Sequence, residues 1–465
     1  MTKAVVLGGG LAGMLTAAAL AGRVDEVTLV ERDQLPESPR PRRCLPQGHH
    51  SHILLRGGAE TFDVLLPGAV GRLHEAGARE RVLARGALAR GPEGWFERLD
   101  TGASMVVCSR DLMDHVIRAD VLADERVTLL EGATVAGLVG TATQVTGVLV
   151  ERDGGTGTIE ADLVVDASGR WSDAPSWLAG LGLPEVREDV VDAGVTYVSR
   201  WYEAPEGTRE DFPGVLVQMV PNTGEPGRGA SLLPMEGRRW LLSLFGSRGG
   251  EPPTDEAGFV AFARERHHPI IADLIAQARP DGPIRAYRGM PDRRRRFEKL
   301  PMPDGFVVIG DAATALNPIH GTGMSLAAKY AVLLRDQLDR GGLRPGFARR
   351  VQAGIAKISA GAWRMAVTTD QGFPDVRTNI TLRSSRMQER MNVRVARTAC
   401  HDAEVSKALF RVASLSAPAS SLMSPSFLWH VLRGPRKPAL TAEQAIAQFP
   451  EFGDLVAPAP ATDAA

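Results

Sequence analysis

The chain has 465 residues, 44% of them hydrophobic and 23% charged, a composition typical of a globular protein with a sizeable core. Lys and Arg number 54 against 55 Asp and Glu, so no net charge favours nucleic acid or an anionic membrane. No apolar run approaches the roughly 18 residues of a membrane span, and the apolar run at 4–7 is too short for a signal peptide, so we expect a cytoplasmic protein.

Residues 3–32 predict a strand, a glycine turn, a helix and a second strand. The turn contains GxGxxG, whose glycines serve a tight turn, the close approach of backbone to a pyrophosphate, and helix–strand packing. Glu31 ends the second strand, where a carboxylate can accept hydrogen bonds from an adenosine ribose. Arg32 is either a solvated charge or a group stacked on adenine. The unit predicts binding of FAD or NAD, through Gly8, Gly10, Leu11, Ala12, Gly13, Glu31 and Arg32.

The segment 45–54, LPQGHHSHIL, contains three histidines. Because no Asp, Glu or Cys in that segment completes a ligand set, we expect no metal site there, and His52 is instead a candidate hydrogen-bonding group near the cofactor or substrate. The cysteines, Cys44, Cys108 and Cys400, share no CxxC spacing. They are predicted to be reduced, buried and small hydrophobic side chains.

Four segments with alternating apolar residues predict antiparallel strands, which would form a sheet that roofs the cofactor: 194–204, 214–221, 229–235 and 238–247. Met219, Leu233 and Phe245 lie on these strands. Each is either a core residue or a contact of the substrate pocket. The run 293–296 consists of four arginines, and we interpret it as a solvated strand edge rather than a phosphate site for NADPH.

A second nucleotide-type signature occupies residues 305–325. Its first half predicts a buried strand that ends at a Gly-Asp pair, where a carboxylate can hydrogen-bond a polyol. The glycines that follow leave bare backbone beside which a flat ring can lie. A helical spacing then begins, so the turn presents a helix amino terminus to the electron-rich edge of a reduced flavin. The signature predicts FAD as the cofactor, with contacts from Asp311, Pro318, Gly321, Gly323 and Met324.

On these motifs the chain resembles the FAD-dependent aromatic hydroxylases and epoxidases. The resemblance implies that Arg110, which opens a predicted helix, is directed towards the FAD phosphates or ribose, and that Val135 is a further cofactor contact. It also implies that the strand and turn at 161–172 return the chain to the FAD domain. Asp166 and Gly169 depart from the Asp-Gly dipeptide that many hydroxylases use near FAD and NADPH, which leaves the nicotinamide route open.

Within that superfamily the chain is similar to the bacterial polyether epoxidases, in the segments 45–54, 192–197, 248–250 and 317–319. It departs from them at 320–324, where it has HGTGM in place of an aromatic residue and Gly-His-Gly-Met. His320 is therefore a candidate substrate contact. The resemblance implies a monooxygenase that uses NAD(P)H and O2 to epoxidise double bonds of a polyketide or polyene through a flavin C4a-hydroperoxide.

The expected fold class is α/β: a Rossmann-like FAD-binding domain of the glutathione-reductase type, an inserted antiparallel sheet for the substrate, and a helical C-terminal region. The two FAD signatures lie far apart in the sequence, so the FAD domain must be discontinuous. The expected segments are 1–75, 101–185 and 283–345 for FAD, 76–100 and 186–282 for the substrate, 346–450 for the helical region and 451–465 for a flexible tail.

No catalytic side chain is assigned, because the cofactor carries most of the chemistry. Other functions remain open: aromatic hydroxylation, which needs a base, saturation of double bonds by a flavin reductase, or a non-redox cyclase that holds FAD. Halogenation is disfavoured because the WxWxIP stretch of flavin halogenases is absent. The expected partners are a small hydrophobic alkene and O2, with no nucleic acid, no metal and no transmembrane segment. The expected assembly is a monomer or homodimer.

Overall fold

The glycine turn of residues 8–13 follows the carboxyl end of the central strand of a five-stranded parallel sheet. The computed structural model describes residues 1–265, 267–382, 385–453 and 455. Strand β1 has β12 on one side and β2 on the other, so the strand order reverses at the carboxyl end of β1, where open α/β sheets bind ligands. In order, the strands are β20 (Phe306–Val308), β12 (Leu163–Asp166), β1 (Lys3–Leu7), β2 (Glu26–Glu31) and β8 (Val127–Glu131).

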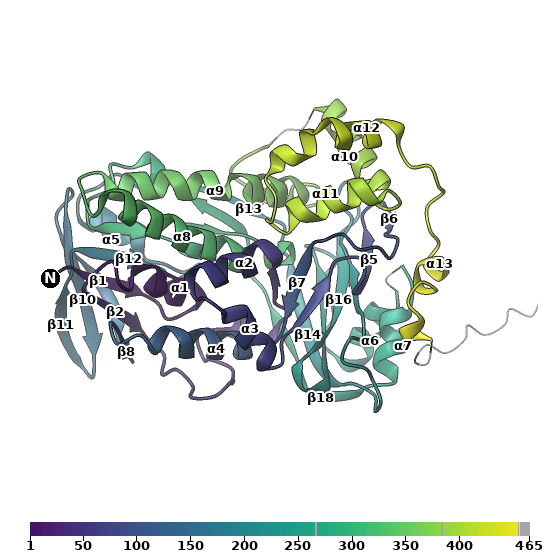
Figure 1. The fold of residues 1–465 in the computed structure, drawn as a ribbon, viewed down its shortest axis with the longest axis horizontal. Helices are drawn as coiled ribbons and strands as arrows, with labels where there is room; N and C mark the ends of the chain where they lie inside the picture. The colour runs from purple at the N-terminus through teal and green to yellow at the C-terminus, as the bar shows by residue number, and fades with distance from the viewer. Residues whose placement is uncertain (266, 383–384, 454, 456–465) are drawn as a thin grey trace, which may run out of the picture.

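Four helices pack around this sheet. The first of them connects β1 to β2, which confirms the predicted strand–helix–strand unit. Helix α1 follows the glycine turn and contacts both α4 and α8, and α9 packs on α8. Figure 1 shows α8 and α9 on one side of α1 and α4 on the other. The helices are α1 (Leu11–Leu20), α4 (Arg110–Leu122), α8 (Gly323–Gly341) and α9 (Phe347–Asp370).

Smaller elements complete this part of the chain. The remaining helices are α2 (Arg56–Leu65), α3 (Ala69–Glu75) and α5 (Ala174–Gly180). One small sheet contains β9 (Thr134–Gly140), β10 (Val145–Arg152) and β11 (Gly155–Glu160), and another contains β3 (Ile53–Leu55), β7 (Ser104–Val107) and β4 (Arg79–Val82). A third contains β21 (Thr314–Ala315), β19 (Asp292–Arg295), β13 (Glu188–Asp192) and β22 (Arg377–Thr378).

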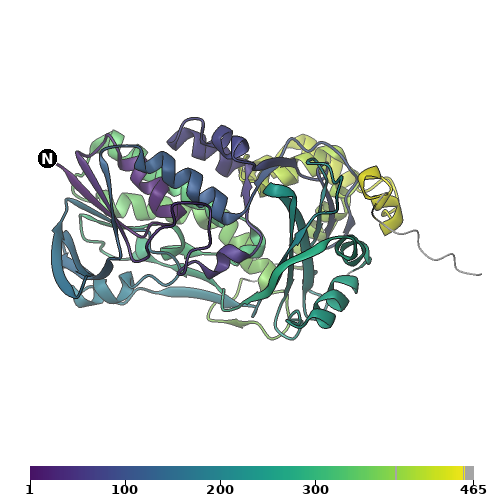
Figure 2. The ribbon, with the colours of Figure 1, turned by 90° about the horizontal axis from the view of Figure 1, so that it is seen from below.

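A seven-stranded sheet lies at the other end of the molecule in both views (Figures 1 and 2). The four predicted strands are confirmed, and all neighbouring pairs are antiparallel except β15 with β5, which are parallel. Strand β18 continues across the expected boundary at 282/283. In order, the strands are β18 (Arg279–Tyr287), β14 (Thr196–Glu203), β17 (Arg239–Gly246), β16 (Arg228–Met235), β15 (Gly214–Val217), β5 (Ala87–Gly91) and β6 (Gly94–Trp95).

The two faces of this sheet have different environments. Leu242 and Leu244 of β17 belong to a core shared with α6 (Glu256–Arg264) and α7 (Ile270–Ala276). The alternate residues Ser243 and Phe245 face a large cavity on the opposite side. The period-two pattern thus separates a packed face from a cavity face.

The arginine run 293–296 is not a solvated strand edge, so that interpretation was wrong. Strand β19 lies inside its sheet between β13 and β21. Arg295 is buried and donates to Glu188 over 2.8 Å, and Arg296 donates to Asp189 over 2.6 Å. The carboxylates on the neighbouring strand β13 make this burial possible, because a buried charge needs a partner.

The C-terminal region is helical, as predicted. It contains α10 (Arg386–Ala399), α11 (Ala403–Ala413), α12 (Pro425–Arg433) and α13 (Ala442–Ile446). The expected tail began too early, because Phe452 is buried and stacks edge-on against Phe212. Residues 454 and 456–465 of that tail lie outside the described residues. Cys108 and Cys400 are buried as predicted, whereas Cys44 is half-buried. Among the described helices, none has the length and apolarity needed to cross a membrane.

Replacing Gly13 with alanine tests the packing of α1 on the glycine turn. A Cβ at Gly13 would lie 1.8 Å from the carbonyl oxygen of Gly8, so the helix would have to move away from the strand. We expect Gly13→Ala to lower the free energy of unfolding by about 2–3 kcal/mol, measured by urea denaturation. The control is Gly71→Ala on an exposed face of α3, where a Cβ meets no atom within 4 Å. Equal stability of the two variants would contradict this packing.

Candidate cofactor and substrate site

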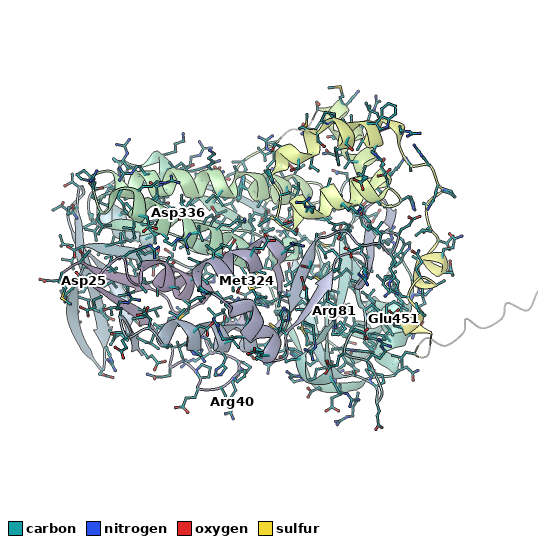
Figure 3. All side chains as sticks on the ribbon, viewed as in Figure 1. Asp25, Arg40, Arg81, Met324, Asp336 and Glu451 are labelled. Atoms are coloured by element: carbon teal, nitrogen blue, oxygen red, sulfur yellow. The ribbon has the colours of Figure 1, made fainter. Side chains whose placement is uncertain are left out.

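A cavity of about 900 Å³ lies between the carboxyl edge of the five-stranded sheet and the inner face of the seven-stranded sheet. Met324 is labelled in Figure 3 where these two parts of the molecule meet. The structure brings together every predicted site residue except Gly13, which is buried beneath the turn. The predicted residues on the cavity wall are Gly8, Gly10, Leu11, Ala12, Glu31, Arg32, His52, Arg110, Val135, Met219, Leu233, Phe245, Asp311, Pro318, His320, Gly321, Gly323 and Met324.

The three glycines of the opening motif meet three different steric demands. Gly8 has φ +97°, and a Cβ there would lie 2.9 Å from the backbone of residues 167 and 168. Gly13 has no room because of the Gly8 carbonyl. Gly10 is different, because a Cβ there would meet no atom within 4 Å and Gly10 lines the cavity. The absence of a side chain at Gly10 therefore leaves space for a ligand, not for the protein.

Glu31 is fixed by a partner that the sequence did not indicate. Its carboxylate accepts hydrogen bonds from the backbone NH of Gly9 at 2.7 Å and of Asp33 at 2.9 Å. Arg42 donates to the same carboxylate at 2.7 Å and to the carbonyl of Gly9 at 2.9 Å. Both side chains are nearly inaccessible to solvent, at 6% and 7% exposure. Arg42 thus neutralises the acid and holds it beside the glycine turn, while Arg32 remains exposed.

Arg110 and Asp311 approach the cavity from different elements. Ser109 caps α4 by accepting from the NH of Leu112, and Arg110 then donates to Asp114 one turn along at 2.6 Å. Asp311 receives no hydrogen bond from any described residue. Burial raises the pKa of Asp311, and the charges of Arg170 and Arg110 counteract that rise. The carboxylate of Asp311 therefore faces the cavity as a hydrogen-bond acceptor without a donor among the described residues.

The turn after β12 explains why Asp166 departs from the Asp-Gly dipeptide of many hydroxylases. Asp166 is fully buried at the strand end and accepts from the NH of Ser168 at 2.9 Å, from the Ser168 hydroxyl at 2.6 Å and from the Ser172 hydroxyl. It therefore stabilises the turn. Arg170 lies on the cavity wall and donates to the carbonyl of Leu316 at 2.8 Å and to that of Pro291.

The inner face of the seven-stranded sheet carries a row of hydroxyl groups next to the histidine segment. Ser199 and Ser243 are paired across β14 and β17, with oxygens 2.6 Å apart. The Nδ1 atom of His50 lies 2.8 Å from the Ser199 oxygen. Burial lowers the pKa of His50 to about 3. Burial and the charge of Arg110 lower the pKa of His52 to about 3 as well, so both histidines are neutral at physiological pH.

His320 lies at the opposite wall in a buried polar cluster. Its Nε2 atom is 3.1 Å from an oxygen of Asp370, the last residue of α9. Asn317 donates its side-chain NH2 to the other oxygen of Asp370 at 2.7 Å and its backbone NH to Asp292 at 2.7 Å. Potential ligand atoms of Asp292, His320 and Asp370 lie within 4.8 Å of one another. Because His320 and Asp370 already share a hydrogen bond, we interpret the cluster as a charge network rather than a metal site.

Sequence reasoning missed Arg42, Arg170 and Asp370. The first two had a weak signal, because each is an arginine close after a strand of the nucleotide unit. Asp370 had none, since it belongs to a helix about 50 residues beyond the motif that it contacts.

The comparisons with known proteins agree with this geometry. A family model for an FAD binding domain matches residues 1–340. The chain is 31% identical to Protein Rv3254 of Mycobacterium tuberculosis over 387 residues, 80% of each protein. It is 28% identical over 378 residues to 6-methylpretetramide 4-monooxygenase of Streptomyces rimosus, covering 76% of this chain and 79% of that enzyme. The structure of p-nitrophenol 4-monooxygenase from Pseudomonas putida superposes with a TM-score of 0.60 at 17% identity, covering 94% of this chain and 100% of that one.

The fold is that of the FAD-dependent hydroxylases and halogenases. The chain belongs to the FAD binding domain family, its cofactor is FAD, and it is a flavoprotein of the monooxygenase type.

Gly10→Val separates cofactor binding from folding. A Cβ at this position has no atom within 4 Å apart from its chain neighbours, and the side chain enters the space where backbone must approach the pyrophosphate. We expect the variant to unfold at the wild-type urea concentration and to bind FAD at least about tenfold more weakly, measured by titration calorimetry of the apoprotein. Gly361→Val, on an exposed face of α9, is the matched control and should bind FAD normally. A Gly10→Val variant that binds FAD with wild-type affinity would contradict the assignment of Gly10 to the pyrophosphate site.

Proposed function

We propose that the chain is an FAD-dependent monooxygenase that epoxidises a carbon–carbon double bond of a large apolar substrate of the polyketide or polyene type, with NAD(P)H and O2 as co-substrates. The observation that carries this proposal is the cavity itself. One continuous space connects the glycine turn and the 310–324 loop with apolar side chains of the seven-stranded sheet, such as Met219, Leu233 and Phe245. A mainly apolar pocket with few convergent polar groups is typical of small-molecule sites.

The described residues fit FAD. The open face of Gly10 and the start of α1 suit the pyrophosphate, and Glu31, held by Arg42, suits the adenosine ribose. Asp311, with its acceptors free, suits the ribityl chain, and Arg110 provides a positive charge nearby. The loop 318–324 with its bare backbone then suits the flavin ring. Bound FAD would supply the redox chemistry by taking electrons from the nicotinamide and delivering them to oxygen.

The protein's own task is to orient the substrate and exclude water. The histidines beside the inner face of the seven-stranded sheet favour an alkene over a phenol as substrate. Hydroxylation of a phenol needs a base that removes its proton, and a histidine with a pKa of about 3 is a poor one at neutral pH. His50 and His52 both have a pKa of about 3 because they are buried. An alkene needs no such base.

Hydroxylation of an aromatic polyketide is the second candidate. It is favoured by the similarity to 6-methylpretetramide 4-monooxygenase. The buried Asp292 behind the cavity wall has a pKa raised by burial and by Asp370, so a carboxyl group that exchanges its proton near neutral pH lies close to the site. For this reaction the proton would have to reach Asp292 through His320, whose ring belongs to the same cluster.

Oxygen labelling distinguishes the two candidates. The FAD-loaded protein is incubated with NADPH and ¹⁸O2, either with a linear polyene or with a polycyclic phenol, and the products are analysed by mass spectrometry. We expect one labelled oxygen atom in an epoxide of the polyene. Labelled oxygen in the phenol alone would contradict epoxidation and support hydroxylation as the reaction. Consumption of NADPH without label in either compound, with all oxygen recovered as peroxide, would contradict the proposed substrate class, and no reduction by NADPH or NADH would contradict the monooxygenase.

A further inference from the structure

His320 and Asp370 form a nearly inaccessible hydrogen-bonded pair at the cavity wall. Their side chains are 9% and 1% exposed, and His320 Nε2 lies 3.1 Å from Asp370 Oδ1. The other oxygen of Asp370 accepts from Asn317, whose own side-chain oxygen accepts from the hydroxyl of Tyr197 at 2.7 Å. Both carboxylate oxygens are therefore engaged, and the imidazole ring has one fixed hydrogen-bond partner.

The surroundings of this pair are acidic and favour a cation. Asp370 ends the 24-residue helix α9, where the negative end of the helix dipole disfavours a carboxylate. Asp292 on β19 adds a second acid, and its Oδ2 atom is buried without a hydrogen-bond partner. The other ionisable groups that face the cluster are Tyr197 from β14 and Arg170 from the turn after β12. Two ionised acids in such a place are costly, and either a nearby cation or a proton on Asp292 lowers that cost.

The protonation state of His320 follows from these neighbours. Burial by itself would lower the pKa of His320, but the hydrogen bond to Asp370 and the charges of Asp370 and Asp292 outweigh burial and raise the pKa above its ordinary value. If Nε2 donates to Asp370, a neutral ring would leave Nδ1 as an acceptor, whereas the imidazolium carries a second N–H there. No described residue bonds to Nδ1, and His320 lines the cavity.

We propose that His320 is an imidazolium at neutral pH whose Nδ1–H stabilises the negative charge that FAD gains on reduction, and that Asp370 is the positioning residue that keeps it charged. Hydride transfer from NAD(P)H brings two electrons and one proton, leaves one negative charge on FAD and makes the nicotinamide ring cationic. His320 keeps its proton throughout. This inference rests on the part of the proposed function that places the flavin ring beside the loop 318–324. A fixed cation there is preorganised to meet that charge.

The midpoint potential of bound FAD tests this role. The holoenzyme is reduced chemically with dithionite, so the measurement needs neither NAD(P)H nor a substrate. The measured potential therefore still tests this role if the enzyme fails to transfer oxygen to the proposed substrate. We expect lower potentials in His320→Gln and Asp370→Asn than in the wild type. The control is His430→Gln, which removes a similar pair, since His430 Nδ1 lies 2.8 Å from Asp402 on the C-terminal helices, away from the cavity wall. Its potential should be unchanged.

The pH dependence has a defined sign. Because the folded pKa of His320 is raised, its charge is complete below the ordinary value of 6.5 and is lost as the pH rises through the folded pKa. The difference in potential between the wild type and His320→Gln should therefore shrink at high pH. A difference that is zero at pH 7, or one that grows with pH, would overturn the proposal.

Nitrogen NMR of ¹⁵N-histidine-labelled protein tests the charge without any redox step. We expect both His320 nitrogens to be protonated at pH 7 in the wild type, and the ring to be neutral at that pH in Asp370→Asn. The His320→Gln spectrum assigns the signal. A wild-type His320 that titrates at or below 6.5 would overturn the inference, even if the variants alter the potential.

Discussion

The close packing of three backbone segments at the carboxyl edge of the five-stranded sheet is the constraint on which the site depends. Gly13 lets α1 approach the Gly8 carbonyl, and Gly8 lets the turn after β12 approach β1. At Gly310, a Cβ would lie 2.9 Å from the side chain of Ala12, so the Gly-Asp turn is held equally close. A side chain at any of these glycines would push the segments apart. Their closeness directs the amino ends of α1 and α8 towards one cavity.

Buried ionisable groups around the cavity are arranged in pairs, and each pair fixes a group that lines the cavity. Arg42 holds Glu31, Asp114 holds Arg110, and Asp370 holds His320. A lone charge at such burial would be expensive or would change its protonation state, so the partner preserves both charge and orientation. Groups held in this way do not need to reorganise when a charged cofactor binds or changes its redox state.

The seven-stranded sheet has the complementary task. Its outer face is closed by α6 and α7, and its inner face presents apolar side chains and a short row of hydroxyls to the cavity. Substitutions on this inner face can therefore change the shape of the cavity without altering the core of the five-stranded sheet.

The sequence by itself determined the local units. The βαβ motif, the Gly-Asp turn before α8 and the alternating strands were predictable because their geometry depends on residues close together in the chain. Only the tertiary structure decided what lies beside them. It turned the arginine run of β19 inwards by pairing it with acids of β13, joined β5 to β15, and brought Arg42 to Glu31 and Asp370 to His320. Burial and pairing between distant segments leave no periodic pattern, so a single sequence does not reveal them.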